Sequence, residues 1–364
     1  MTNRDFLFIL FLHTGVWKIR LWQKDKNLLL LSGFYAIEDS SCKPEAGLSQ
    51  VDNESLDEYC HGCGFAFFYV QRDRRARLVS EFVYKGFRKE EMEFQFNPRA
   101  LVQDYDYWKT EKAKGSESAR RTLKSKLDVP YGSGQRQAAD IFLTDKPNAP
   151  VLIYFHGGYW RGGSKDENSH FAPTFVKAGV TVVLVGYDLC PGVTVAEIVK
   201  QAHAGVAWVY RHIGNYGGDP SRLYISGVSA GGHLVAMALA HDWEKEGLPN
   251  DLIKGAIAIS GVYDLDPVLH ISVNQEIGLD SDSVRENSPM LHPPISRASL
   301  IIAVGGDEPR GWKQMSADFY ALCKSRGIDC HFLEIPGTHH FSITTRLDDP
   351  KSALSRAMLK QIGY

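Results

Sequence analysis

Three things are scarce in this 364-residue sequence: cysteine, excess charge of either sign, and long apolar runs. Six cysteines at irregular spacing do not form the pattern of a disulfide framework. Residues 60–63 form one C-x-x-C, and no second C-x-x-C or C-x-x-H accompanies it, which argues against a structural zinc site. The formal net charge of −2 gives no general attraction to nucleic acid or to an anionic membrane.

The apolar run at residues 6–12 is too short to cross a bilayer and is a poor signal-peptide core, because no clear cleavage site follows it. Up to residue 91 the chain shows no strong periodicity and no catalytic constellation. We therefore divide it into an N-terminal extension, residues 1–91, and a catalytic domain, residues 92–364. The simplest hypothesis is that the extension lies outside the catalytic unit and is not translated in the main native product, which would begin at Met92.

Beyond Met92, short β-branched runs alternate with helical patterns. This alternation predicts a doubly wound α/β fold with a mainly parallel sheet, whose active groups gather at the carboxyl ends of the strands. Strands are expected at residues 139–143, 151–155, 181–185, 223–226, 253–260, 299–304 and 331–335, and helices at 196–211 and 313–326.

The most informative motif is G-V-S-A-G at residues 227–231. A β-prone stretch precedes it, and a segment rich in small, helix-favouring residues follows it. Strand, sharp turn and helix in that order are typical of the nucleophile elbow of an α/β-hydrolase, which makes Ser229 the candidate nucleophile.

A second motif, H-G-G-Y-W at residues 156–160, follows the predicted strand 151–155. Glycines let the main chain approach a substrate, so that backbone N–H groups can stabilise a developing oxyanion. We expect Gly157 and Gly158 to donate from this loop, and Ala230 to donate from the residue after the nucleophile.

In this fold an acid and then a histidine follow the nucleophile along the chain. Asp307 is the preferred acid and Glu308 the second choice, since both follow the predicted strand 299–304. The base is His339 or His340, which follow the last predicted strand. Two further acids, Asp264 and Asp266, also follow a strand, but we expect them to cap the next helix or turn.

The H-G-G-x-W and G-x-S-A-G motifs together resemble those of the kynurenine formamidase (arylformamidase) family, which is related to the hormone-sensitive-lipase-like esterases. The resemblance runs from about Met92 to Tyr364. It favours His340 as the base, because the family's histidine is similarly followed by phenylalanine; His339 stands where the family often has an acidic residue. Further matching segments are residues 129–134, 187–191, 260–265 and 307–316.

The resemblance implies hydrolysis of N-formyl-L-kynurenine to L-kynurenine and formate. The Ser-His-Asp triad of Ser229, His340 and Asp307, which the motifs predict apart from the resemblance, would carry out this reaction without metal or cofactor. Tyr159 and Trp160 would either line the aryl pocket or pack beneath their loop. The resemblance also implies a small-molecule aryl formamide substrate, a location in the cytoplasm and also in the nucleus, and a homodimer as the candidate assembly. From the net charge we expect no nucleic-acid or membrane partner. Two other classes stay open: a carboxylesterase for small acyl esters, and a non-enzymatic binding protein on a hydrolase scaffold.

Overall fold

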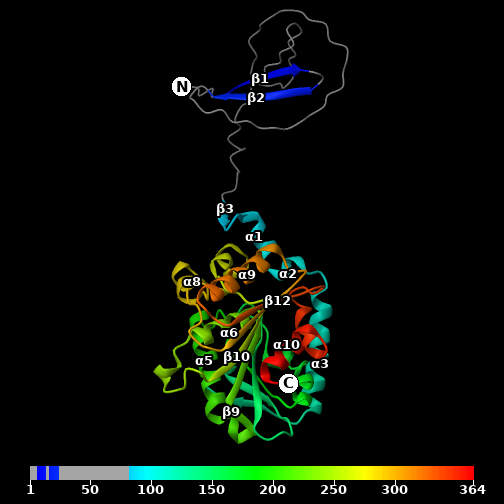
Figure 1. Cartoon of the computed structure of the whole chain (residues 1–364), viewed down its shortest axis with the longest axis vertical. Coiled ribbons are helices and arrows are strands. Elements are labelled where there is room, and N and C mark those ends of the chain that lie inside the picture. The colour runs from blue at the N-terminus through cyan, green and yellow to red at the C-terminus, as the bar shows by residue number, and fades with distance from the viewer. Residues whose placement is uncertain (1–5, 14–15, 24–81) are drawn as a thin grey trace, which may run out of the picture. The chain divides into compact units, whose positions relative to one another are not determined.

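The computed structural model describes residues 6–13, 16–23 and 82–364, which fall into two units, residues 1–79 and 80–364 (Figure 1). In the first unit, strands β1 (Phe6–His13) and β2 (Val16–Gln23) pair antiparallel. The C-x-x-C at residues 60–63 lies outside the described residues. Within the described residues, no helix is both long enough and apolar enough to cross a membrane. The cytoplasmic or nuclear location and the homodimer stay predictions.

The second unit is built on one eight-stranded sheet with the order β12-β11-β10-β9-β7-β8-β6-β5. The six strands from β12 to β8 are parallel, while β6 runs antiparallel to β8, and β5 antiparallel to β6. This confirms the predicted α/β-hydrolase architecture. The strands are β5 (Ser125–Pro130), β6 (Ala138–Phe142), β7 (Ala149–Phe155), β8 (Thr181–Val185), β9 (Gly218–Val228), β10 (Ile253–Ile259), β11 (Ser299–Gly305) and β12 (Cys330–Ile335).

Helices cover both faces of this sheet (Figure 1). Every residue of β7 is buried, as expected for a parallel strand with packing on both sides. Ile153 belongs to the core shared with α5, α6 and α9, whereas its neighbour Leu152 packs in the core with α4 and α10. The α-helices are α1 (Lys89–Phe96), α2 (Pro98–Leu101), α3 (Tyr105–Thr122), α4 (Ala172–Ala178), α5 (Val195–His212), α6 (Ala230–Ala240), α7 (Asn274–Ile277), α8 (Ser281–Asn287), α9 (Arg310–Ser325) and α10 (Ala353–Ile362). The 3-10 helices are η2 (Lys165–Asn168), η3 (Ile213–Tyr216), η4 (Trp243–Glu246), η5 (Asp266–His270) and η6 (Ile343–Asp348).

The structured unit includes residues that the sequence pattern assigns to the extension. A short hairpin of β3 (Phe82–Tyr84) and β4 (Phe87–Arg88) leads into α1. Phe87 is buried, and its ring meets Phe96 edge-on at 5.5 Å between centroids. The Tyr84 hydroxyl donates to Asp264 Oδ2 at 2.9 Å. The unit therefore begins at Ser80 rather than at Met92.

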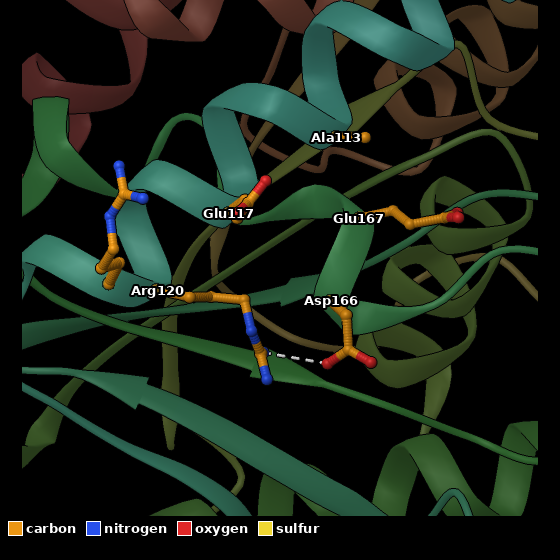
Figure 2. A pocket seen from close by; sticks show the side chains of 6 residues that line it. Ala113, Glu117, Arg120, Asp166 and Glu167 are labelled. Carbon is orange, nitrogen blue, oxygen red and sulfur yellow. Dashed lines mark ion pairs between the residues drawn. The ribbon is translucent and has the colours of Figure 1, made fainter.

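A buried ionic network attaches α3 to the sheet. Asp140 on β6 is fully buried and accepts hydrogen bonds from Lys165 Nζ at 2.9 Å, from the Asp128 backbone N–H at 2.8 Å, and from Arg120. Figure 2 shows Arg120 reaching from α3 to Asp166, with which it forms an ion pair at 2.9 Å. The Lys165 ammonium forms ion pairs with the carboxylates of Asp128, Asp140 and Asp166, so it balances part of their negative charge. The neighbouring surface pocket of about 490 Å³ is lined by Ala113, Glu117, Arg120, Arg121, Asp166 and Glu167.

Truncation tests the N-terminal boundary. A chain that starts at Ser80 should unfold at the same temperature as the second unit of the full chain. A chain that starts at Met92 lacks Tyr84 and Phe87, and should lose about 3–5 kcal/mol of unfolding free energy, the usual cost of deleting a buried aromatic side chain. Urea titrations of both proteins give the difference. Equal stability of the two would show that the hairpin adds nothing to the core.

The ionic network predicts unequal effects of two similar substitutions. Asp140→Asn should lower the unfolding free energy by about 3–5 kcal/mol, because it removes the buried charge that Lys165 and Arg120 share. Asp166→Asn should cost at most about 1 kcal/mol, since that side chain is 53% exposed. Denaturant unfolding measures both. Equal losses of unfolding free energy in the two variants would contradict the view that the buried carboxylate of Asp140 is the centre of the network.

Candidate active site

Ser229 lies at the sharp turn between β9 and α6. Its φ of 58° and ψ of −120° are strained values for a residue with a side chain. The glycines around it are required by close backbone approach: a Cβ atom on Gly227 would lie 2.4 Å from the Gly231 carbonyl oxygen, and one on Gly231 would lie 2.1 Å from the Phe155 carbonyl oxygen. The local geometry is that of a nucleophile elbow.

His340 follows β12 and faces Glu308. Its Nδ1 lies 2.9 Å from Glu308 Oε2, and both side chains are buried. The other carboxylate oxygen, Oε1, accepts the backbone N–H of Gly305 at 2.9 Å and the Ser260 hydroxyl. These bonds fix the carboxylate as an acceptor for an Nδ1 proton, so that Nε2 is the ring nitrogen left to act as a base.

The structure places Glu308, and not Asp307, beside His340. The sequence favours Asp307, but Asp307 is exposed, and its backbone N–H donates to the Thr338 carbonyl. Strand β11 ends at Gly305, and the Glu308 N–H closes a turn onto the Gly305 carbonyl at 3.2 Å. This turn places residue 307 at the surface and residue 308 inside, a difference of one residue that composition does not encode.

The other sequence candidates lie elsewhere. His339 pairs through Nε2 with Asp104 at 3.4 Å, so of the two histidines it is His340 that faces the acid. Asp264 Oδ1 accepts the backbone N–H of Asp266 at 3.2 Å, but the N-cap of η5 is Leu265, which makes no side-chain cap hydrogen bond.

The glycine loop after β7 borders the same cavity as the serine and the histidine. Gly157 and Gly158 line it, and Gly158 has a φ of 129° that favours glycine. A Cβ atom on Gly157 would lie 3.1 Å from Ser229 Cβ, so a side chain there would crowd the nucleophile. Ala230 is the first residue of α6, where backbone N–H groups have no partner within the helix.

The two aromatic residues of the loop differ in their surroundings. Tyr159 lines the cavity, and its hydroxyl donates to the Phe96 carbonyl. Trp160 is fully buried, and its indole N–H donates to His233 Nδ1 at 3.2 Å. Burial lowers the pKa of His233 to about 4, which keeps its ring neutral, so that Nδ1 can accept this hydrogen bond. Trp160 thus packs beneath the loop.

His156 holds the loop from below. Its ring stacks on Tyr187 at 4.2 Å between centroids, and its Nδ1 lies 2.8 Å from the Gly157 carbonyl. The Tyr187 hydroxyl donates to the His156 carbonyl at 2.6 Å. Burial lowers the pKa of His156 to about 4, so the ring is neutral at physiological pH and acts as a structural support.

The cavity in front of Ser229 and His340 has a volume of about 500 Å³, enough for a small organic substrate. One wall comes from α2, its N-cap residue Asn97, and α3, which carry no recognisable motif and which the sequence does not assign to the site. This wall supplies Asn97, Pro98, Arg99, Tyr105, Lys109 and Lys112.

Comparisons with known proteins agree with this geometry. A family model described as alpha/beta hydrolase fold matches residues 152–341. Kynurenine formamidase of Danio rerio is 34% identical over 77% of this chain and 98% of its own length, and that of Salmo salar is 35% identical with the same coverage. The chain belongs to the kynurenine formamidase family.

Among solved structures, a putative thioesterase from Silicibacter sp. TM1040 superposes on this family member with a TM-score of 0.64. It is 28% identical and covers 73% of this chain and 97% of its own. As a member of the kynurenine formamidase family with an α/β-hydrolase fold, the protein is a hydrolase. The segment matched by the family model contains Ser229, Glu308 and His340.

The buried carboxylate predicts a large asymmetry between two adjacent acids. Glu308→Gln should lower kcat by roughly 10³–10⁴-fold, because the amide no longer stabilises an imidazolium or fixes its tautomer. Asp307→Asn should change kcat by less than about threefold, since its side chain faces solvent. Steady-state kinetics on any turned-over substrate measure both. A larger loss at Asp307 would restore it as the acid.

Proposed function

We propose that the protein hydrolyses N-formyl-L-kynurenine to L-kynurenine and formate, with Ser229 as nucleophile, His340 as general base and Glu308 as the acid that orients it. The observation that carries this proposal is the match to two fish kynurenine formamidases over 98% of their lengths. Ser229 and His340 also support the proposal, because a nucleophile and a base that line the same cavity can both act on one bound substrate.

The first half of the reaction forms a formyl-enzyme. His340 Nε2 takes the proton of the Ser229 hydroxyl as Oγ attacks the formyl carbon. The resulting oxyanion accepts hydrogen bonds from the backbone N–H groups of Gly157, Gly158 and Ala230. Glu308 stabilises the imidazolium through Nδ1. When the tetrahedral intermediate collapses, the C–N bond breaks and His340 returns its proton to the aryl amine, which leaves as L-kynurenine.

The second half releases formate. His340 takes a proton from water, whose oxygen attacks the formyl carbon of the Ser229 ester. Collapse of this second intermediate breaks the bond to Ser229 Oγ, which regains a proton from His340, and the formic acid that leaves gives up its proton to water as formate. The nucleophile and the base are thus restored, and the only other reactant is water.

Progress curves on two substrates separate this proposal from a carboxylesterase. The purified chain should hydrolyse N-formyl-L-kynurenine with a higher kcat/KM than a short p-nitrophenyl ester. The reverse preference would favour the carboxylesterase. Labelling of Ser229 by a fluorophosphonate would exclude a non-enzymatic binding protein.

Mutation of the nucleophile and the base tests their joint action. Ser229→Ala and His340→Ala should each lower kcat by roughly 10³-fold or more, and the double variant should be little worse than either, because the two groups act as a unit. His339→Ala is the matched control and should cost far less, since that ring pairs with Asp104. Near-normal turnover by Ser229→Ala would rule out the covalent mechanism.

A further inference from the structure

Lys112 projects from the middle of α3 into the wall of the catalytic cavity, where it lies with Ser229 and His340 among the lining residues. Its side chain is partly buried. Among the described residues, no carboxylate forms an ion pair with its ammonium group, although Glu167 and Asp348 are close enough to attract it. A partly buried charge without a partner is costly in a protein, and an anionic ligand would offset that cost.

The charges around the cavity are mostly positive. Arg99, Lys109, Lys112 and Arg161 line it, whereas Glu167 is the acid among the described lining residues. Two of the cations have other contacts: Arg161 pairs with Glu276 at 2.6 Å, and Arg99 lies over the Tyr105 ring at 3.6 Å. Lys109 is exposed to solvent, which screens its charge. Lys112 is therefore the partly buried lining cation that, among the described residues, has neither a carboxylate partner nor an aromatic contact.

Desolvation lowers the pKa of Lys112 to about 8, while the carboxylates of Glu167 on η2 and Asp348 on η6 act in the opposite direction. Below that pH the side chain is mostly an ammonium ion. A bound carboxylate would raise the pKa further, because it favours the charged form.

We propose that Lys112 binds the carboxylate of the substrate and is the residue by which the site selects anionic, amino-acid-like leaving groups over neutral ones. This inference rests on the proposed function for its substrate, since N-formyl-L-kynurenine carries an α-carboxylate apart from the formamide that Ser229 attacks. Lys112 is a specificity-determining residue: it contacts the substrate away from the reacting atoms and acts mainly through binding.

The test compares N-formyl-L-kynurenine with its α-carboxamide, which keeps the formanilide and the α-amino group but lacks the negative charge. The wild-type KM should be about tenfold lower for the acid, the usual value of one hydrogen bond to a charged group. Lys112→Met should raise the KM for the acid by about tenfold, with kcat changed by less than about threefold, and should remove the preference over the carboxamide. Lys112→Arg should retain the preference. Lys114→Met, an exposed lysine on the same helix that pairs with Glu111, is the matched control and should behave as wild type.

The pH profile supplies a readout that a merely structural role would not move. The wild-type KM for the acid, divided by that for the carboxamide, should rise as the pH passes about 8, because Lys112 loses its proton there. The ratio should stay low in Lys112→Arg, whose guanidinium remains charged, and should stay near one in Lys112→Met. Division by the carboxamide value cancels titration of the base, while titration of the substrate's amino group, which occurs at a lower pH in the carboxamide, is the same for the wild type and for Lys112→Met. Because Lys109 also faces the cavity, persistence of the rise in Lys112→Met would assign the effect to another group and overturn the proposal.

Failure of this inference differs from failure of the proposed function. Equal KM values for acid and carboxamide in the wild type, or an equal loss on both in Lys112→Met, would overturn the role of Lys112 while formamidase activity stands. If neither kynurenine compound is hydrolysed, the proposed function fails, and 3-acetoxybenzoate and its carboxamide then carry the charge test as esters. A preference for the charged ester that Lys112→Met removes would support the anion site, and no preference would refute it.

Discussion

The close approach of three main-chain segments around Ser229 is the constraint on which the rest of the site depends. The end of β7, the end of β9 and the start of α6 come so near one another that Gly227 and Gly231 leave no room for a side chain. This crowding forces the strained backbone of Ser229 and sets the N-terminus of α6 directly behind it. The loop after β7 is then close enough for Gly157 to border the nucleophile. The acid and the base only have to reach a position that the backbone has already fixed.

Short-range pattern was sufficient to predict much of the fold and part of the site. The strands of the parallel sheet are apolar runs that need burial on both faces, and the elbow is a local motif whose glycines have a steric cause. The sequence favours Asp307, whereas the structure places Glu308 beside His340, because a single turn after β11 decides which side chain enters the core. Residues before Met92 also belong to the compact unit, since Tyr84 and Phe87 lie in its core and Tyr84 bonds to Asp264, far along the chain. Contacts of this kind leave no periodicity near their own position.

The wall formed by α2 and α3 was missed for a related reason. Its residues are polar and unremarkable in sequence, and they face the catalytic groups only because the tertiary structure places them there. The buried carboxylate of Asp140 contributes to this placement through Arg120, which belongs to the same helix as Lys112. The ionic network therefore bears on the shape of the cavity as well as on the packing of the sheet.

The length of α3 has a consequence for how this scaffold can change. Its 18 residues extend over roughly 27 Å, so one end is anchored to the sheet while the middle borders the cavity. The proposed catalytic groups, Ser229, Glu308 and His340, follow the ends of β9, β11 and β12, where steric crowding tolerates few alternatives. The α3 surface that faces the cavity carries no such restriction. Substitutions along α3 can thus change which leaving group the protein accepts, while the residues that cleave the bond stay the same.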